Sequence, residues 1–136
     1  MVNFIETKVR SERIQSDGTS KQIVDRYLVQ ADSFTEAEEI IVNSVDVDSI
    51  ESVSRSNVRE LFLGNGGSDV PLYKAKVEFV SYDEKTHKEK RKSHVVMVEA
   101  ADIASAVERV KDGLFGTPDY EILSVAKSPI VDVFGL

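Results

Sequence analysis

Basic side chains recur with a spacing of two in two stretches of the chain, and this spacing suits the binding of an anion. Lys8 and Arg10 are two positions apart, and so are Lys74 and Lys76. Because successive side chains of a strand point to opposite faces, each pair shares one face. Charge-assisted hydrogen bonds from two or three such side chains are enough to hold a small anion such as a nucleotide. The predicted ligand-binding residues are Lys8, Arg10, Arg26, Tyr27, Tyr73, Lys74, Lys76, Lys90, Arg91 and Lys92.

The same residues permit two other interpretations. Tyrosines interleaved with basic side chains on an exposed sheet face would suit single-stranded nucleic acid, whose bases stack on aromatic rings. The face is otherwise an ordinary solvated surface. Duplex DNA is not favoured as a partner, because the formal net charge is −7 and duplex binding depends on clustered Lys and Arg.

Catalytic and metal-binding residues are not predicted. The chain has no cysteine and two histidines, too few ligands for a structural zinc site. His87 lies in a charged segment where a solvated side chain is expected, and no motif pairs a nucleophile with a base. We therefore expect no catalytic activity, no metal and no cofactor. No apolar run approaches the roughly 20 residues of a membrane helix, so we expect a cytoplasmic protein.

These candidate residues are carried by a unit that occurs twice. Residues 27–41 and 96–110 align at an offset of 69 and share the polarity pattern of a strand, a polar cap and an amphipathic helix. The match extends to both sides, at an offset of 68 for residues 7–9 and of 72 for residues 50–56. Each copy is therefore predicted to be a ββαβ unit.

The first copy begins with a predicted hairpin. Residues 4–14 alternate between apolar and polar side chains, and residues 23–31 return after an Asp-Gly turn signal. Ser33 begins a capping-box pattern that predicts the start of a helix. Residues 50–56 predict a third strand, whereas residues 57–62 fit either a helical turn or a continued strand.

The second copy repeats this order. Residues 73–82 and 93–100 predict a hairpin, Asp102 predicts a helix cap, and residues 120–127 predict a strand. The tail at residues 129–134 is apolar. We expect it to pack as an extra strand or against a second subunit.

The fold class predicted from these elements is α+β: a duplicated ββαβ unit that forms one mostly antiparallel sheet with two helices on one face. Residues 1–136 are expected to be a single domain, composed of a first repeat (1–62), a glycine-rich linker (63–71) and a second repeat with a C-terminal strand (72–136). The alternative is two separate lobes joined by the linker. The edge strands of such a sheet and the apolar tail predict a homo-oligomer, most simply a dimer.

Several segments together carry a family resemblance: residues 7–10, 27–29, 33–38, 73–77, 83–86, 88–90, 119–125 and 129–134. The Ser-Phe-Thr-Glu-Ala segment at residues 33–37 and the C-terminal segment are the most specific. With these segments the chain resembles a family of small uncharacterised proteins of Bacteroides-type bacteria and their phages, over nearly its whole length. The resemblance supplies no catalytic residue. It implies a phage or mobile-element protein that acts inside a bacterial cell.

The function expected from residues and resemblance together is non-catalytic binding. The protein would capture a small anionic nucleotide signal or a host protein, and so blunt host defence. The alternatives are a single-stranded nucleic-acid-binding protein that uses the exposed sheet face, and a structural or assembly protein of a phage.

Overall fold

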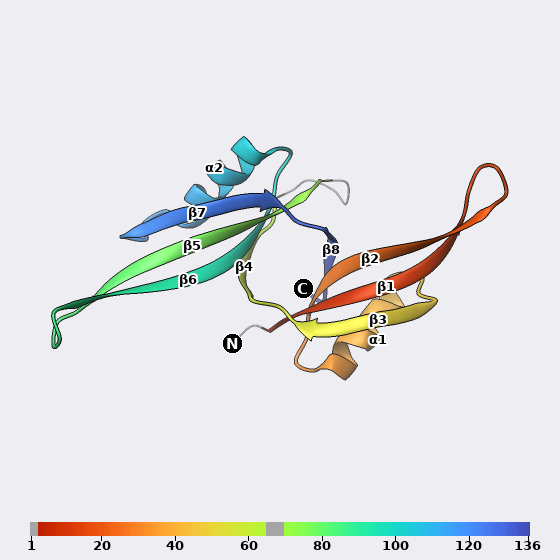
Figure 1. Ribbon diagram of the computed structural model, residues 1–136, viewed down its shortest axis with the longest axis horizontal. Helices are drawn as coiled ribbons and strands as arrows, with labels where there is room; N and C mark the ends of the chain where they lie inside the picture. Colours follow the sequence, from red (N-terminus) through yellow and green to blue (C-terminus); the bar gives the residue numbers. More distant parts are fainter. Residues whose placement is uncertain (1–2, 65–69) are drawn as a thin grey trace. The chain divides into compact units, whose positions relative to one another are not determined.

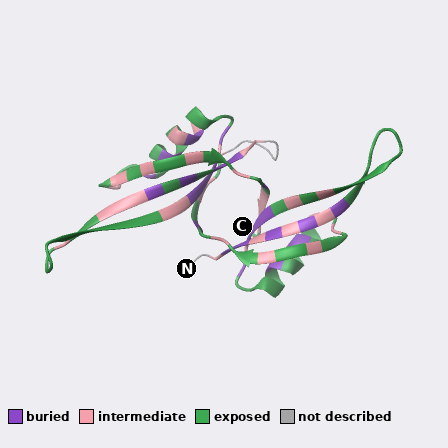
Figure 2. Ribbon diagram, viewed as in Figure 1, coloured by how far each residue is buried: buried purple, intermediate pink, exposed green. Residues whose placement is uncertain are grey.

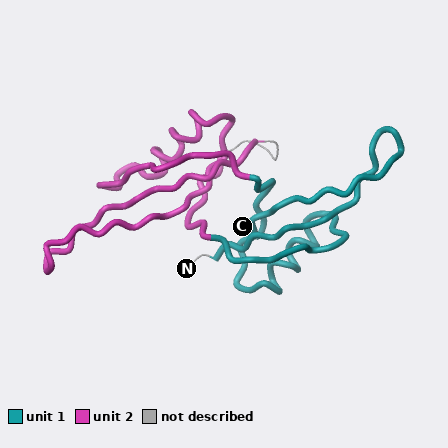
Figure 3. The backbone as a smooth tube through the Cα atoms, in the orientation of Figure 1, with its two compact units in different colours: residues 1–56, 129–136 teal, residues 57–128 magenta. Residues whose placement is uncertain are grey.

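The computed structural model describes residues 3–64 and 70–136. The chain forms an α+β fold with two four-stranded sheets, each accompanied by one helix (Figure 1). It divides into two compact units (Figure 3): unit 1 comprises Met1–Ser56 and Pro129–Leu136, and unit 2 comprises Asn57–Ser128. The predicted fold class, with its duplicated ββαβ-like unit, is confirmed.

Unit 1 contains the strands β1 (Phe4–Ile14), β2 (Ser20–Gln30), β3 (Ser49–Arg55) and β8 (Ile130–Phe134), and the helix α1 (Phe34–Ser44). The strand order is β3-β1-β2-β8. The first three strands pair antiparallel, whereas β8 runs parallel to β2. The turn between β1 and β2 contains a glycine with a φ of 87°, a left-handed conformation that glycine adopts without a steric penalty.

Unit 2 contains the strands β4 (Val58–Phe62), β5 (Leu72–Asp83), β6 (Lys88–Glu99) and β7 (Tyr120–Lys127), and the helix α2 (Ile103–Gly113). The strand order is β4-β6-β5-β7. Here β4 runs parallel to β6, and the remaining pairs are antiparallel. The two sheets therefore have the same topology.

Both helices begin at the predicted caps. The Ser33 hydroxyl accepts a hydrogen bond from the Glu36 amide at 3.1 Å, and the Glu36 carboxylate accepts one from the Asp32 amide at 3.0 Å. In the second helix the Asp102 carboxylate accepts from the Ser105 amide at 2.7 Å. The bonds from Glu36 and Ser105 satisfy amides of the first turn that have no partner within the helix, and the bond from Asp32 ties the preceding residue to that turn.

Each unit has its own hydrophobic core between the helix and one face of the sheet. In unit 1 the buried helix residues are Ala37 and Ile41, and in unit 2 they are Ala106 and Val110. They pack against the alternate apolar residues of the central strands, as the period-two pattern predicts. The buried residues follow the central strands, and the tips of both hairpins are exposed (Figure 2).

The expectation of one shared sheet is wrong. The structure has two separate sheets, and each receives its fourth strand from the other repeat. The segment at residues 57–62, which was ambiguous between helix and strand, is β4 and pairs with β6 of unit 2. The C-terminal tail is a strand, one of its two predicted roles, but it pairs with β2 of unit 1.

This exchange also changes the role of the glycine-rich linker. The linker follows β4 and precedes β5, and both of these strands belong to unit 2. It therefore connects two strands of one sheet and does not join the two units, which the chain links at Ser56–Asn57 and Ser128–Pro129. Residues 65–69 of the predicted linker lie outside the described residues.

Candidate functional site

The predicted basic cluster is divided between the two sheets. Lys8 and Arg10 lie on β1 of unit 1, whereas Lys74 and Lys76 lie on β5 of unit 2. Each pair shares one face of its own strand, as predicted. The single sheet face that was expected to gather all four side chains does not exist, because the repeats form two sheets.

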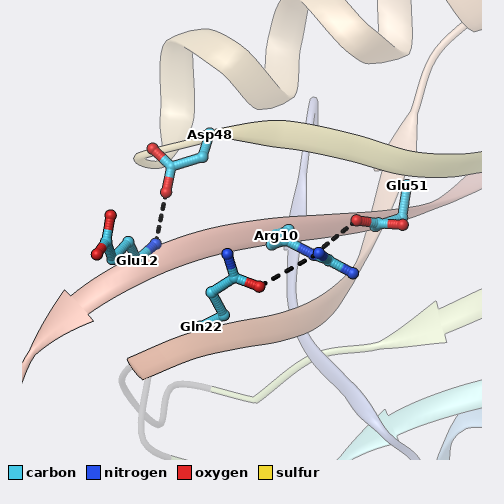
Figure 4. A network of polar contacts seen from close by, with 5 residues as sticks. All are labelled: Arg10, Glu12, Gln22, Asp48 and Glu51. Atoms are coloured by element: carbon cyan, nitrogen blue, oxygen red, sulfur yellow. Dashed lines mark hydrogen bonds and ion pairs between the residues drawn. The ribbon is translucent and has the colours of Figure 1, made fainter. Parts of the chain in front are cut away.

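Acidic neighbours also offset several of the predicted cations. The Arg10 guanidinium lies 2.7 Å from the Glu51 carboxylate and donates a hydrogen bond to Gln22 (Figure 4). The Arg26 guanidinium lies 3.2 Å from the Glu6 carboxylate. A surface side chain that is already paired offers an incoming anion less attraction, because its acidic partner repels the anion.

The predicted residues of the second hairpin are paired in the same way. The Arg91 guanidinium lies 2.8 Å from the Glu78 carboxylate and 3.6 Å from that of Glu89. The hydrogen bond to Glu78 raises the pKa of Arg91 above its ordinary value. The Lys90 ammonium lies 3.8 Å from the Asp83 carboxylate. Lys92 lies on the same strand, and its side chain is exposed.

The two tyrosines of the predicted site are core residues. Tyr27 and Tyr73 are each 6% exposed and pack within the hydrophobic cores of unit 1 and unit 2, respectively. Their rings are therefore not available as a stacking surface for nucleic-acid bases, and this part of the prediction is wrong. The period-two pattern placed them on strands correctly, but they lie on the face that the helix covers.

A pocket of about 430 Å³ opens in unit 1 beside the C-terminal end of α1. Its walls come from the outer part of β1, from β2, and from the last turn of α1 with the residues that follow it. This volume is within the range of small-molecule sites. The polar residues that line it include Ser11, Arg13, Tyr27, Asn43, Ser44 and Asp46.

Arg13 and Tyr27 are linked through one carboxylate at this pocket. The Arg13 guanidinium lies 3.2 Å from the Asp25 carboxylate and donates a hydrogen bond to it. Burial raises the pKa of the Tyr27 phenol, and the negative charge of Asp25 together with a side-chain hydrogen bond to it raises the pKa further. The phenol therefore stays protonated, and Asp25 is shared between two donors.

The end of α1 contributes acceptors to the same pocket. The last turn of the helix contains no basic residue, so its carbonyl groups form an uncompensated negative pole. The Ile40 and Ile41 carbonyls already accept hydrogen bonds, from the Ser44 hydroxyl at 2.6 Å and the Val45 amide at 3.1 Å, so the acceptors that the helix end can offer are the carbonyls of residues 42–44. Among residues 3–64 and 70–136, no cation lies within ion-pair distance of the Asp46 carboxylate.

The register of the sheets identifies the corresponding region of unit 2. Val9 lies opposite Asp25 and Ile50 in unit 1. Val77 lies opposite His94 and Ile122 in unit 2. Val9 and Val77 are therefore equivalent, and so are their partners. Counting along the strands from these positions gives three equivalent pairs of residues near the pocket: Ser11 and Phe79, Asp25 and His94, and Asp48 and Tyr120.

Aromatic side chains occupy these three positions in unit 2. The rings of Phe79 and His94 lie 4.9 Å apart, and Phe79 and Tyr120 pack against the core. In unit 1, Ser11 replaces the first ring, and the Asp48 carboxylate accepts a hydrogen bond from the Glu12 amide at 2.6 Å. Unit 2 therefore has aromatic side chains at the positions where unit 1 has small or acidic residues near its pocket, and one of them, Tyr120, also lines a pocket of unit 2.

Sequence reasoning missed most of this pocket. Of its polar residues, the predicted site included Tyr27 alone, and Ser11, Arg13, Asn43 and Asp46 were absent from it. A signal was present. When the repeats are aligned at their local offsets, the first repeat has a small or acidic residue at each of the three positions where the second has an aromatic one. That signal has a meaning only when the strand register shows that the three positions are neighbours.

A second, shallow pocket of about 540 Å³ lies in unit 2 along the β5–β6 hairpin, and it includes the predicted residue Arg91. Glu89 and Glu121 line it as well. Because Arg91 is already paired with Glu78 and Glu89, this pocket offers little uncompensated charge to a ligand. The pocket of unit 1 is the stronger candidate.

Two features are absent from the part of the chain that the structure describes. No group of three or more His, Asp or Glu side chains is arranged to hold a metal ion among residues 3–64 and 70–136. In the same ranges, no helix is long and apolar enough to cross a membrane.

Comparison with known proteins places the chain in a family without assigning it a function. Residues 3–136 match the family model described as a domain of unknown function, DUF4494, so the chain belongs to that family. No curated protein sequence and no solved structure matches the chain. The residues of the two pockets are therefore interpreted from their own geometry.

Proposed function

We propose that this member of the DUF4494 family is a binding protein that holds a small polar molecule in the pocket of unit 1. The observation that carries the proposal is the difference between the repeats. One fold occurs twice in the chain, and in one copy three aromatic side chains occupy the equivalent positions, two of them packed against the core. The other copy has small and acidic residues there, beside a pocket of about 430 Å³.

The chemistry of the lining supports capture of a ligand. Hydroxyl, amide, guanidinium and carboxylate groups surround the pocket, and each charge-assisted hydrogen bond to a ligand contributes roughly 1.5–3 kcal/mol. Two such bonds contribute about 3–6 kcal/mol together, which corresponds to affinities between roughly millimolar and tens of micromolar before other contacts are added. Binding without turnover remains part of the proposal, and it rests on the lack of an activated nucleophile in the sequence motifs.

The biological setting that we propose comes from the family resemblance. A protein of Bacteroides-type bacteria or their phages, acting in the bacterial cytoplasm, would remove a small signal molecule and so weaken host defence. Capture of an anion by the sheet faces has less support than the pocket, because Arg10, Arg26 and Arg91 are paired with carboxylates. Binding of a host protein or of single-stranded nucleic acid at those faces has no supporting contact.

We also propose that the protein is a homodimer. The strands β3 and β7 are at the edges of their sheets, and an edge strand presents unpaired backbone groups to which another chain can bind. The C-terminal tail no longer supports this proposal, because it is paired within the chain as β8. Light scattering at micromolar concentration should give twice the monomer mass, and a monomer mass would contradict the proposal.

The ligand pocket is tested by filling it as unit 2 is filled. The variant Ser11→Phe places in unit 1 the residue that unit 2 has at the same position. Wild-type protein is incubated with the small-molecule fraction of a bacterial extract and examined by native mass spectrometry. We expect an added mass of a few hundred daltons or less on the wild type, and none on Ser11→Phe.

The matched control is Ser11→Ala, which changes the same residue but leaves the pocket open. It should retain the added mass, because one neutral hydroxyl contributes only about 0.5–1.5 kcal/mol. Retention of the added mass by Ser11→Phe, with the variant folded by circular dichroism, would place the ligand elsewhere. Absence of any added mass on the wild type would contradict the proposed function.

A further inference from the structure

We infer that the ligand of the unit 1 pocket carries a positively charged amine, an inference that rests on the proposed function and specifies its ligand class. Three features of the pocket support a cation. They are the carboxylate of Asp46, the open C-terminal end of α1, and the pairing of Arg13 with Asp25.

The residues at the C-terminal end of α1 line one side of the pocket. Val42, Asn43 and Ser44 form the last turn of α1 and line the pocket together with Asp46. The carbonyl groups at a helix C-terminus carry a partial negative charge that favours cations. An ammonium group has three donors and no acceptor, so it matches a wall made of carbonyl and carboxylate oxygens.

The charges of the residues that line the pocket also favour a cation. Arg13 is the only basic residue among the residues that line the pocket, and Asp25 offsets its charge. Asp46 lines the pocket, and its carboxylate has no cation within ion-pair distance among the described residues. The Asp46 carboxylate would repel an anion that enters this pocket, whereas an amine would supply the counter-ion that this carboxylate lacks.

Substitution of Arg13 tests the inference, because it should change the binding of amines and the binding of anions in opposite directions. In Arg13→Gln the Asp25 carboxylate loses its cation, so the pocket becomes more negative. Binding of an amine should then strengthen, and binding of an anion should weaken. Arg13 has 60% of its side chain exposed, so the substitution removes no core contact.

The experiment uses 1,4-diaminobutane as the amine probe, adenosine monophosphate as the anionic probe and ribose as the neutral probe. Each is titrated into full-length ¹⁵N-labelled protein, and the amide shifts of residues 11–13 and 42–46 are followed. We expect 1,4-diaminobutane to shift these amides at the lowest concentration. Asp46→Asn should weaken its binding about tenfold, as loss of a charge-assisted bond implies. Asp112→Asn, the same charge change at the end of α2 in unit 2, should leave the affinity unchanged.

The outcomes separate this inference from the proposed function. Shifts caused by adenosine monophosphate or ribose, with no shift from the amine, would overturn the amine inference and leave the pocket as a binding site. Weaker amine binding in Arg13→Gln would overturn it as well. If none of the three probes shifts the pocket amides and no extract molecule binds in the mass spectrometry experiment, both the inference and the proposed function fail.

Discussion

Ser11 and Phe79 occupy the same position in two copies of one fold. Ser11 lies opposite Ile23 in the β1–β2 ladder, and Phe79 lies opposite Lys92 in the β5–β6 ladder. The phenyl ring packs against the core of unit 2, whereas the serine lines an open pocket in unit 1. The exchange of Ser11 for Phe79 is therefore one of the three differences that distinguish the packed region of unit 2 from the candidate ligand site of unit 1.

Phe79→Ser should open in unit 2 the space that is already open in unit 1. The substitution removes packing between Phe79, His94 and the core. Because Phe79 is half-buried, we expect the free energy of unfolding to fall by about 1–3 kcal/mol, less than for a fully buried ring. Urea denaturation measures this value. Ser11→Ala is the control at the equivalent position and should change stability by less than about 0.5 kcal/mol. Equal losses in the two variants would contradict the difference between the repeats.

Gly135 should be required for the exchanged strand β8 to pair with β2. Its φ is 83°, and a methyl group in place of its hydrogen would overlap the carbonyl oxygen of Gln30. Gly135→Ala should therefore lower the free energy of unfolding by more than the cost of about 1–2 kcal/mol for a left-handed φ alone. Amides of residues 27–29, which lie beside β8, should exchange faster with deuterium.

Gly18→Ala is the matched control for the exchanged strand. Gly18 has nearly the same φ, 87°, but a methyl group there would meet no atom within 4 Å. It should show the conformational cost without the faster exchange at residues 27–29. Equal effects of the two substitutions on stability and exchange would show that contact with Gln30 does not matter.

The charge of Asp102 should stabilise α2 in a pH-dependent way. Hydrogen bonding by Ser105 lowers the pKa of this carboxyl below its ordinary value of 3.8. A carboxyl whose pKa is lower in the folded state stabilises the fold above its unfolded-state pKa, and the stabilisation is lost as the pH falls through the folded-state value. Asp102→Asn keeps a capping side chain but removes the charge.

The measurement for Asp102 is the difference in unfolding free energy between the wild type and Asp102→Asn. The wild type should be more stable at pH 7, and the difference should shrink as the pH falls below about 4, the ordinary carboxyl range. A difference that is the same at pH 7 and pH 2.5 would show that charge at this cap contributes nothing.

Tyr27 should ionise at a higher pH than a solvated tyrosine. Burial and the neighbouring Asp25 raise the pKa of its phenol above the ordinary value of 10.0. The folded state holds this proton more tightly, so its stabilising contribution is complete below the unfolded-state pKa and is lost as the pH rises through the folded-state value. Spectrophotometric titration should show a late transition that Tyr27→Phe removes. A titration unchanged by Tyr27→Phe would contradict the described environment of the phenol.

The local elements could be predicted from the sequence because their causes are local. Period-two alternation specified the four long hairpin strands, and the side chains of Ser33 and Asp102 specified the helix starts. Ala37 and Ala106 are buried on the inner faces of the helices, as the amphipathic patterns within residues 27–41 and 96–110 predict. The duplication was visible as well, because equivalent positions keep the same polarity when each copy must bury the same face.

The partners of the short strands were decided only by the tertiary structure. Alternation shows which side chains of a strand share a face, but not which strand lies beside it. The strands β4 and β8 have similar patterns and pair with equivalent neighbours, so nothing local distinguishes a shared sheet from two sheets with exchanged strands. The long-range register, set by packing in each core, made that choice.

For the candidate site, too, part could be predicted from the sequence and part depends on the tertiary structure. Composition and spacing identified basic residues on strands, which follows from sequence alone. Whether a cation is available to a ligand depends on the carboxylate that lies opposite, as Glu51 does for Arg10, and whether Tyr27 is exposed depends on which face α1 covers. The pocket exists because β1, β2 and the end of α1 meet at Ser11. Such a meeting of distant segments is a property of the folded chain.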